Sequence, residues 1–205
     1  MQYDYGLWQT VIFHIIFAIL FLVSFIKPRK KYEWKSMGAV SGFFVALFTE
    51  MYGFPLTIYF VSSILGFNLS TINPFAHESG HLLAAFGFGI ETAALFCQLG
   101  NLFFIIGLIF IVWGWRKIHK NESGLVKTRI YKYIRHPQYL GIFLLILGML
   151  IQWPTLVTLF MAPFLIVSYY KLAKREEKEL QNKFGEDFKK YKENTSMFIP
   201  IKMKY

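Results

Sequence analysis

The chain has 205 residues, of which 55% are hydrophobic and 20% aromatic, and its formal net charge at pH 7 is +10. The hydrophobic and aromatic fractions exceed ordinary soluble usage, so they argue against a soluble fold and favour an integral membrane protein. Cys97 is the only cysteine, which excludes an intrachain disulfide and a thiolate metal cluster.

Five apolar runs are long enough to predict transmembrane helices, at residues 7–26, 37–65, 92–118, 137–153 and 155–172. The first run lacks a basic start and a cleavage site, so we expect it to remain as a helix and not to act as a signal peptide. Gly53 and Pro55 predict a kink in the second run. Pro154 predicts a tight turn that makes the last two runs a helical hairpin.

The basic residues are clustered along the chain. All 22 lysines and arginines fall within residues 27–35, 116–135 and 171–204. If five helices alternate across a bilayer, these three segments lie on one side, and the positive-inside bias makes that side the cytoplasm. The N-terminus is then outside and the C-terminus inside. This placement explains the charge as a topology signal, so we expect the lipid bilayer and no nucleic acid as a partner.

One acidic residue, Glu50, lies inside a predicted membrane helix. A carboxylate is costly in lipid, so we expect it to face the protein interior or a wet cavity. His14 in the first helix lies at a similar depth and is the expected partner. The sequence leaves open whether this is a structural pair or a contact with substrate.

The chain turns polar after Leu172 but keeps helical spacing. We expect the fifth helix to continue into the cytoplasm and to end near Gly185, since glycine suits the position after a helix end. A shorter amphipathic helix should follow, with Phe188 and Tyr191 on one face, lying against the membrane or the bundle. The predicted fold class is all-α: an integral membrane bundle of about five transmembrane helices, with a C-terminal hairpin and a cytoplasmic helical extension.

Ionisable residues gather where this hairpin meets the predicted cytoplasmic face. Pro137 suits the first position of a helix, whose free amides attract anions, and Arg135 adds a forked donor beside them. His136 flanks the same opening, and Glu176 and Glu177 emerge across the hairpin. Taken singly, these residues are more typical of helix-end anchors and a solvated face. Their joint spacing favours a site that binds both an anion and a cation.

These residues belong to a longer pattern between residues 124 and 200. It consists of Leu125–Val126, Tyr131, RHPQYLG at 135–141, EEKEL at 176–180, FGEDFKKY at 184–191 and FIP at 198–200. The pattern resembles the membrane-embedded methyltransferases that include isoprenylcysteine carboxyl methyltransferase and the phospholipid N-methyltransferases. The first 120 residues match that family only as generic helices.

The resemblance implies an enzyme that uses S-adenosylmethionine to methylate a lipophilic acceptor entering from the bilayer. Together with the apolar runs, it divides the chain into three transmembrane helices in residues 1–120 and a cofactor-binding methyltransferase unit in residues 121–205. The residues it implies are His136, Gln138 and Tyr139 in the cofactor pocket, Glu176 on a polar or cationic part of the cofactor, Glu177 in support, and Arg135 as the catalytic residue that orients a carboxylate. No metal ligand is implied.

Two positions depart from the family pattern. Arg129 stands where the family usually has a glycine, so the loop before Tyr131 is expected to differ in shape. Leu172 stands where prenylcysteine enzymes have a substrate-binding arginine, which argues against a prenylcysteine acceptor unless Lys171 or Arg175 substitutes. Lipid amines, small thiols and other lipophilic nucleophiles remain as acceptors.

Three rival functions stay open. His77, Glu78 and His81 match the H-E-x-x-H spacing of zinc proteases, although no convincing third ligand is visible and the topology places them outside. A sterol-reductase type of enzyme has a similar His-Pro-x-Tyr motif and uses a nicotinamide cofactor. A non-enzymatic membrane scaffold is the third class. The acceptor, the oligomeric state and the membrane are not readable from the sequence.

Overall fold

The computed structural model describes residues 7–26, 31–65, 89–120 and 124–200. This part of the chain forms α-helices and no named strand, which confirms the all-α prediction. The helices are α1 (Trp8–Ile26), α2 (Lys31–Phe48), α3 (Leu56–Leu65), α4 (Gly89–Lys120), α5 (Pro137–Gln152) and α6 (Leu156–Asn194).

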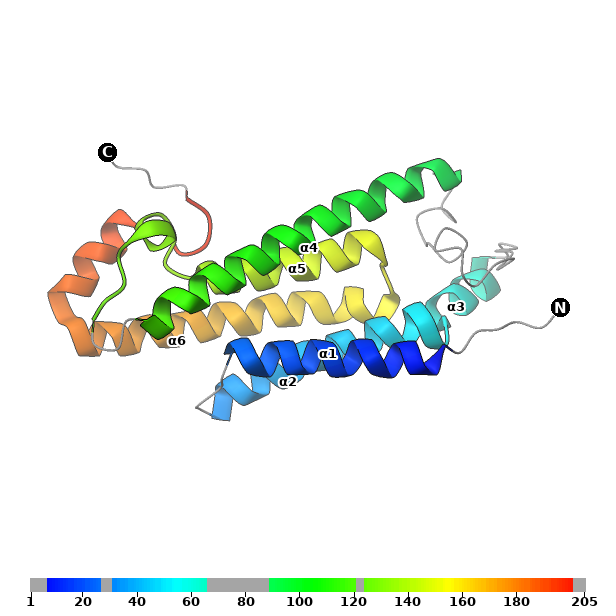
Figure 1. Cartoon of the computed structure of the whole chain (residues 1–205), viewed down its shortest axis with the longest axis horizontal. Helices are drawn as coiled ribbons and strands as arrows, with labels where there is room; N and C mark the ends of the chain where they lie inside the picture. The colour runs from blue at the N-terminus through cyan, green and yellow to red at the C-terminus, as the bar shows by residue number, and fades with distance from the viewer. Residues whose placement is uncertain (1–6, 27–30, 66–88, 121–123, 201–205) are drawn as a thin grey trace.

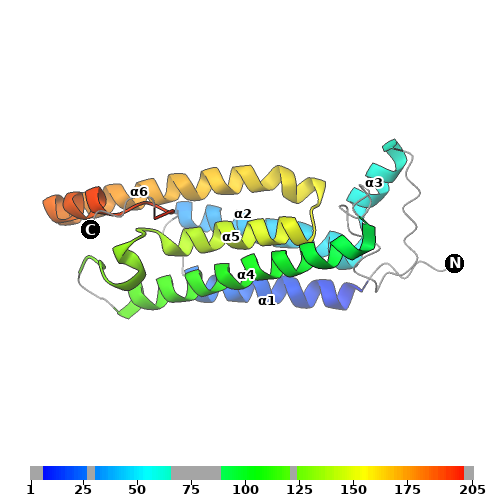
Figure 2. The same ribbon diagram turned by 90° about the horizontal axis from the view of Figure 1, so that it is seen from above.

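The long helices run alongside one another in an elongated bundle, and the charged end of α6 extends beyond the others (Figures 1 and 2). One hydrophobic core connects residues of α1, α2, α4, α5 and α6. The division into residues 1–120 and 121–205 therefore stays a prediction, because its two parts share this core.

Two of the helices are long and apolar enough to cross a membrane. They are residues 94–117 of α4 and the apolar part of α6. α1 and α5 are apolar but present shorter stretches, at Trp8–Ser24 and Pro137–Gln152. Five crossings therefore remain a prediction.

The second predicted helix is broken, as Gly53 and Pro55 indicated. α2 passes into a π-helix at Thr49–Gly53, and α3 begins at Leu56. The break frees the amide of Thr57 in the first turn of α3, and Glu50 Oε2 accepts a hydrogen bond from it at 2.9 Å. A buried carboxylate at a helix N-terminus satisfies a free donor and complements the helix dipole. Glu50 therefore stabilises the kink.

The predicted pair between His14 and Glu50 is wrong. His14 Nδ1 lies 2.8 Å from the carbonyl oxygen of Thr10, one turn earlier in its own helix. Its ring stacks against Tyr52, with the centroids 4.9 Å apart. Glu50 instead accepts its hydrogen bond from Thr57 at the start of α3, where the break in the helix leaves an amide free.

α4 and α5 approach closely through glycines spaced seven residues apart. A Cβ built on Gly100 would lie 2.6 Å from Gly148 O, and one built on Gly107 would lie 2.6 Å from Gly141 O. The pairing runs in opposite directions along the two helices, so they are antiparallel. Small residues let helix backbones meet in a membrane, where packing and not the hydrophobic effect drives association. The glycine at position 141 thus accommodates α4 and not a ligand.

Replacing Gly107 with alanine should therefore destabilise the protein by about 1–3 kcal/mol, because the new methyl group overlaps the backbone of α5. Gly38→Ala is the matched control, since a Cβ there meets nothing within 4 Å. Thermal unfolding of the purified protein in detergent measures both. Equal midpoints for the two variants would contradict the close packing of α4 and α5.

The helical hairpin and the helical extension after it form as the sequence predicted. Trp153 and Pro154 connect α5 to α6, and Thr155 caps α6 by accepting a hydrogen bond from the amide of Thr158. α6 continues into the charged segment, where Gly185 (φ 50°) breaks the helical geometry as predicted. The last turns fold back against the start of α5 (Figure 1).

Candidate active site

The start of α5 is held by the C-terminal segment of the chain. Pro137 occupies the first helical position and His136 is the N-cap residue. The amide of Arg135 donates to Ser196 O at 2.9 Å, and the amide of His136 donates to Met197 O at 3.1 Å. Sequence reasoning marked this segment only as the end of the family pattern, and it did not predict the pairing.

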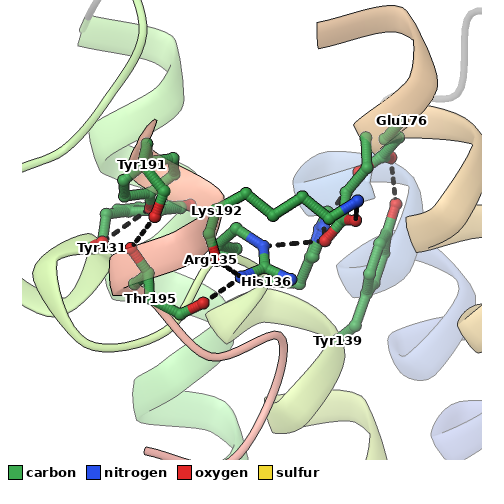
Figure 3. A network of polar contacts seen from close by, with 9 residues as sticks. Tyr131, Arg135, His136, Tyr139, Glu176, Tyr191, Lys192 and Thr195 are labelled. Atoms are coloured by element: carbon green, nitrogen blue, oxygen red, sulfur yellow. Dashed lines mark hydrogen bonds and ion pairs between the residues drawn. The ribbon is translucent and has the colours of Figure 1, made fainter. Parts of the chain in front are cut away.

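Glu177 is a buried carboxylate with cationic partners, and two of these, Arg135 and Lys192, are labelled in Figure 3. Its Oε1 accepts a hydrogen bond from Arg135 Nε at 2.8 Å, and its Oε2 lies 3.1 Å from Lys192 Nζ. The side chain is only 2% exposed. Burial alone would raise the pKa of Glu177, but its contacts with His136, Arg135 and Lys192 outweigh burial and lower this pKa to about 2. Glu177 is therefore ionised and paired with cations within the protein.

Glu176 has neutral and imidazole partners and is more accessible. Its Oε1 accepts a short hydrogen bond from the Tyr139 hydroxyl, and its Oε2 lies 3.4 Å from His136 Nδ1. Its side chain is 28% exposed, compared with 2% for Glu177. Of the two neighbouring carboxylates, Glu176 is the one that a ligand can reach.

His136 lies between the two glutamates. Nε2 is 3.5 Å from Glu177 Oε1, an ion-pair separation at which no well-aligned hydrogen bond forms. Burial would lower the pKa of His136, but the proximity and charge of Glu176 and Glu177 raise it. The His136 ring thus lies between the buried carboxylate and the accessible one.

Gln138 belongs to a second set of contacts, with Tyr131. The Tyr131 hydroxyl lies 2.9 Å from Gly114 O and 2.9 Å from Gln138 Oε1. One hydroxyl proton cannot serve both acceptors, so the Gln138 amide is better placed with its NH₂ group donating to Tyr131. The Tyr191 hydroxyl donates to Tyr131 O at 2.6 Å. This chain of contacts ties α4, α5 and the last turns of α6 together.

A cavity of about 370 Å³ opens between these elements, which is within the usual size range of ligand pockets. Of the predicted site residues, it is lined by Arg135, His136, Gln138 and Glu176, whereas Tyr139 and Glu177 support the lining from behind. The lining residues that sequence reasoning did not assign to the site are Gly124, Leu125, Val126, Tyr131, Glu179, Leu180, Lys183, Phe188 and Tyr191. Most of them lie in the family pattern, so membership of that pattern was the signal available.

The two departures from the family pattern have distinct structural outcomes. Leu172 is 4% exposed and belongs to the hydrophobic core. Lys171 and Arg175 are exposed, and the Arg175 guanidinium lies over the Tyr32 ring at 5.2 Å. Arg129 has φ 58°, the left-handed region that glycine prefers. The backbone at residue 129 therefore has the left-handed conformation that would suit the glycine of the family. A residue with a side chain in this conformation costs roughly 1 kcal/mol.

The pKa shifts of Glu177 and His136 predict how stability depends on pH between acid and neutral conditions. The pKa of Glu177 is lowered from 4.5, so its stabilising contribution is present above pH 4.5 and lost as pH falls towards 2. The pKa of His136 is raised from 6.5, so its contribution is complete below pH 6.5 and lost as pH rises through the folded-state value. We expect unfolding midpoints to be highest between those limits. His136→Asn should abolish the decline in stability above pH 6.5, and equal slopes above that pH in both proteins would refute this assignment.

The comparisons with known proteins agree with the position of this site. The sequence model of the family described as phospholipid methyltransferase matches residues 75–187, more than half of the chain. No curated protein matches the sequence significantly. The matched range contains the whole of α4 and α5 and both glutamates.

Proposed function

Since the chain belongs to the phospholipid methyltransferase family, we propose that it is an integral membrane enzyme that uses S-adenosylmethionine to methylate a lipophilic acceptor at the cytoplasmic face. The observation that carries the proposal is the accessible carboxylate of Glu176 in a cavity that also contains Arg135. Bound S-adenosylmethionine would supply an electrophilic methyl group on a sulfonium. The residues of the chain would hold and orient the two reactants.

The donor set fits this cofactor, which carries two cationic groups and one carboxylate. Glu176 would bind a cationic or polar part, since it lines the cavity and is held in place by Tyr139 and His136. Gln138 would contribute a neutral polar contact from the wall. Lys183, which lines the same cavity, adds positive charge beside it. A charge-assisted hydrogen bond in such a site is stronger than one between neutral groups.

Arg135 would orient a carboxylate of the bound reactants. A guanidinium has five N–H donors. In this chain one donates to Glu177, and others donate to the carbonyl oxygens of Lys192 and Thr195. The two remaining N–H groups of Arg135 are available to a ligand in the cavity. Glu177 would act as a positioning residue, because it holds Arg135 rather than reaching the cavity itself.

Methyl transfer between a sulfonium and a nucleophile needs little proton transfer, so positioning would supply most of the acceleration. An apolar wall next to the site favours a lipophilic acceptor. The Phe198 ring lies 6.1 Å from that of His136 and 5.2 Å from that of Phe143, measured between centroids. Such a wall would seat an acyl or prenyl chain beside the polar cavity and limit the access of water.

The direct experiment is incubation of the purified protein with methyl-labelled S-adenosylmethionine and a lipid extract, followed by identification of the labelled product. We expect label in one class of lipophilic product with the wild-type protein and none with Glu176→Gln. A product that carries no label but forms at the expense of a reduced nicotinamide would support the sterol-reductase alternative instead. Zinc in the purified sample, with activity lost on chelation, would support the protease. His77, Glu78 and His81, on which the protease depends, lie outside the described residues.

A further inference from the structure

A second cavity lies apart from the candidate active site and has a different chemistry. Its volume is about 670 Å³. It shares no lining residue with the cavity that contains Glu176, and its own lining consists of Trp113, Arg116, Lys117, Arg129, Ile130 and Tyr133. Three of these six residues are cations and two are aromatic, which is the composition expected of an anion site at a membrane interface.

The three cations have no acidic partner in the described part of the chain. Glu177, by contrast, is bound by Arg135 and Lys192 at the other site. Arg116 and Arg129 are exposed, and Lys117 is half-buried. Cations that merely anchor a helix end do not need to converge on one cavity. Here they come from the end of α4 and from the loop before α5, so the fold brings them together.

Arg129 gives a separate reason to assign a role to this cavity. Its backbone has φ 58°, where a glycine would be unstrained. The backbone of an arginine in this conformation is strained, so it does not stabilise the fold. Its side chain lines the cavity beside Arg116 and Lys117. The strain is therefore explained if the guanidinium binds a ligand.

The surface of α4 indicates what kind of anion reaches the cavity. Apolar side chains at helical spacing remain exposed along one face of α4, and these are Leu102 (53%), Ile105 (55%), Ile109 (40%) and Trp113 (62%). The same face continues to Arg116 at the cavity. An apolar stripe that ends in a cationic pocket matches the shape and chemistry of a lipid with a negatively charged headgroup.

We propose that this cavity binds the phosphate of an anionic phospholipid whose acyl chains lie along the exposed face of α4. The site is separate from the methyl-transfer site, and the lipid bound there is not the methyl acceptor. Arg129 and Arg116 bind the phosphate as forked donors, and Lys117 adds charge. The exposed rings of Trp113 and Tyr133 lie at the level of the headgroup.

The test is native mass spectrometry of the full-length protein in neutral detergent, titrated with phosphatidylglycerol and separately with phosphatidylcholine. We expect the wild-type protein to prefer phosphatidylglycerol and Arg129→Gly to bind it about fivefold more weakly, as removal of one cation near a lipid phosphate predicts. The double variant Arg116→Gln/Lys117→Gln should lose the preference. Glycine is unstrained at the φ angle of residue 129, so misfolding would not explain weaker lipid binding by Arg129→Gly.

The control is Lys127→Gln, which removes an exposed cation of the same loop that does not line the cavity. Its affinity for phosphatidylglycerol should equal that of the wild type. Unchanged binding in Arg129→Gly, equal binding of phosphatidylcholine, or displacement of the lipid by an equal concentration of inorganic phosphate would each overturn the proposal. S-adenosylhomocysteine binding should be unaffected by these variants, so the result is independent of the proposed function.

Discussion

Replacing Glu176 with glutamine should weaken S-adenosylhomocysteine binding about 10- to 100-fold while leaving thermal stability nearly unchanged. The carboxylate lines the cavity and is 28% exposed, so its charge is available to a ligand. A hydrogen bond to a charged group contributes about 1.5–3 kcal/mol, which corresponds to the stated loss of affinity. Glutamine keeps the shape and an acceptor for the Tyr139 hydroxyl, so the local packing should persist. Isothermal titration calorimetry measures the affinity.

Glu186→Gln is the matched control for this variant. Glu186 lies on the same helix, its side chain is 74% exposed, and its ion pair with Lys189 is on the surface. Surface pairs of this kind contribute little to stability, and none of the cavity lining involves Glu186. Binding that is as strong in Glu176→Gln as in Glu186→Gln would remove the main support for the proposed cofactor site.

Glu177→Gln, in contrast to Glu176→Gln, should cause a large loss of thermal stability. Arg135 is 9% exposed at its side chain and would keep its positive charge without this buried counter-ion. Removal of one partner from a buried ion pair costs about 3–5 kcal/mol. For a chain of this size, the unfolding midpoint should fall by roughly 6 to 20 °C. Thermal unfolding in detergent, followed by intrinsic fluorescence, measures the change.

A double-mutant cycle with Arg135→Gln separates the pair from general damage. If Glu177 acts mainly by neutralising Arg135, the double variant should lose less stability than the sum of the two single variants. Strictly additive losses would show that the two side chains act independently. A stability of Glu177→Gln equal to that of the wild type would contradict the buried ion-pair network altogether.

Local sequence chemistry was sufficient for the positions of the helices and their breaks. The apolar runs, Gly53 and Pro55 in the second helix, and Gly185 in the last one all act within a few residues, so a chain pattern can report them. The same holds for the start of α5, because Pro137 has no amide hydrogen to lose at the first helical position. The family pattern also pointed to the two helix ends whose residues line the cavity with Glu176.

The sequence did not predict these contacts between distant segments correctly. Sequence alone paired His14 with Glu50 because the two lie at a similar depth, but Glu50 accepts a hydrogen bond from the amide of Thr57. The seven-residue spacing of Gly100, Gly107 and Gly114 was visible in the chain, yet only the structure identified α5 as the partner helix.

The sequence by itself determined which segments are apolar, roughly where the helices lie and where they break, since each of these depends on neighbours along the chain. Only the tertiary structure decided that Glu177 is buried and engaged while Glu176 faces the cavity. It also brought Lys192 from the end of the chain to Glu177. Burial and pairing depend on which distant groups fill the surrounding space, and adjacent residues of one type can therefore have different roles.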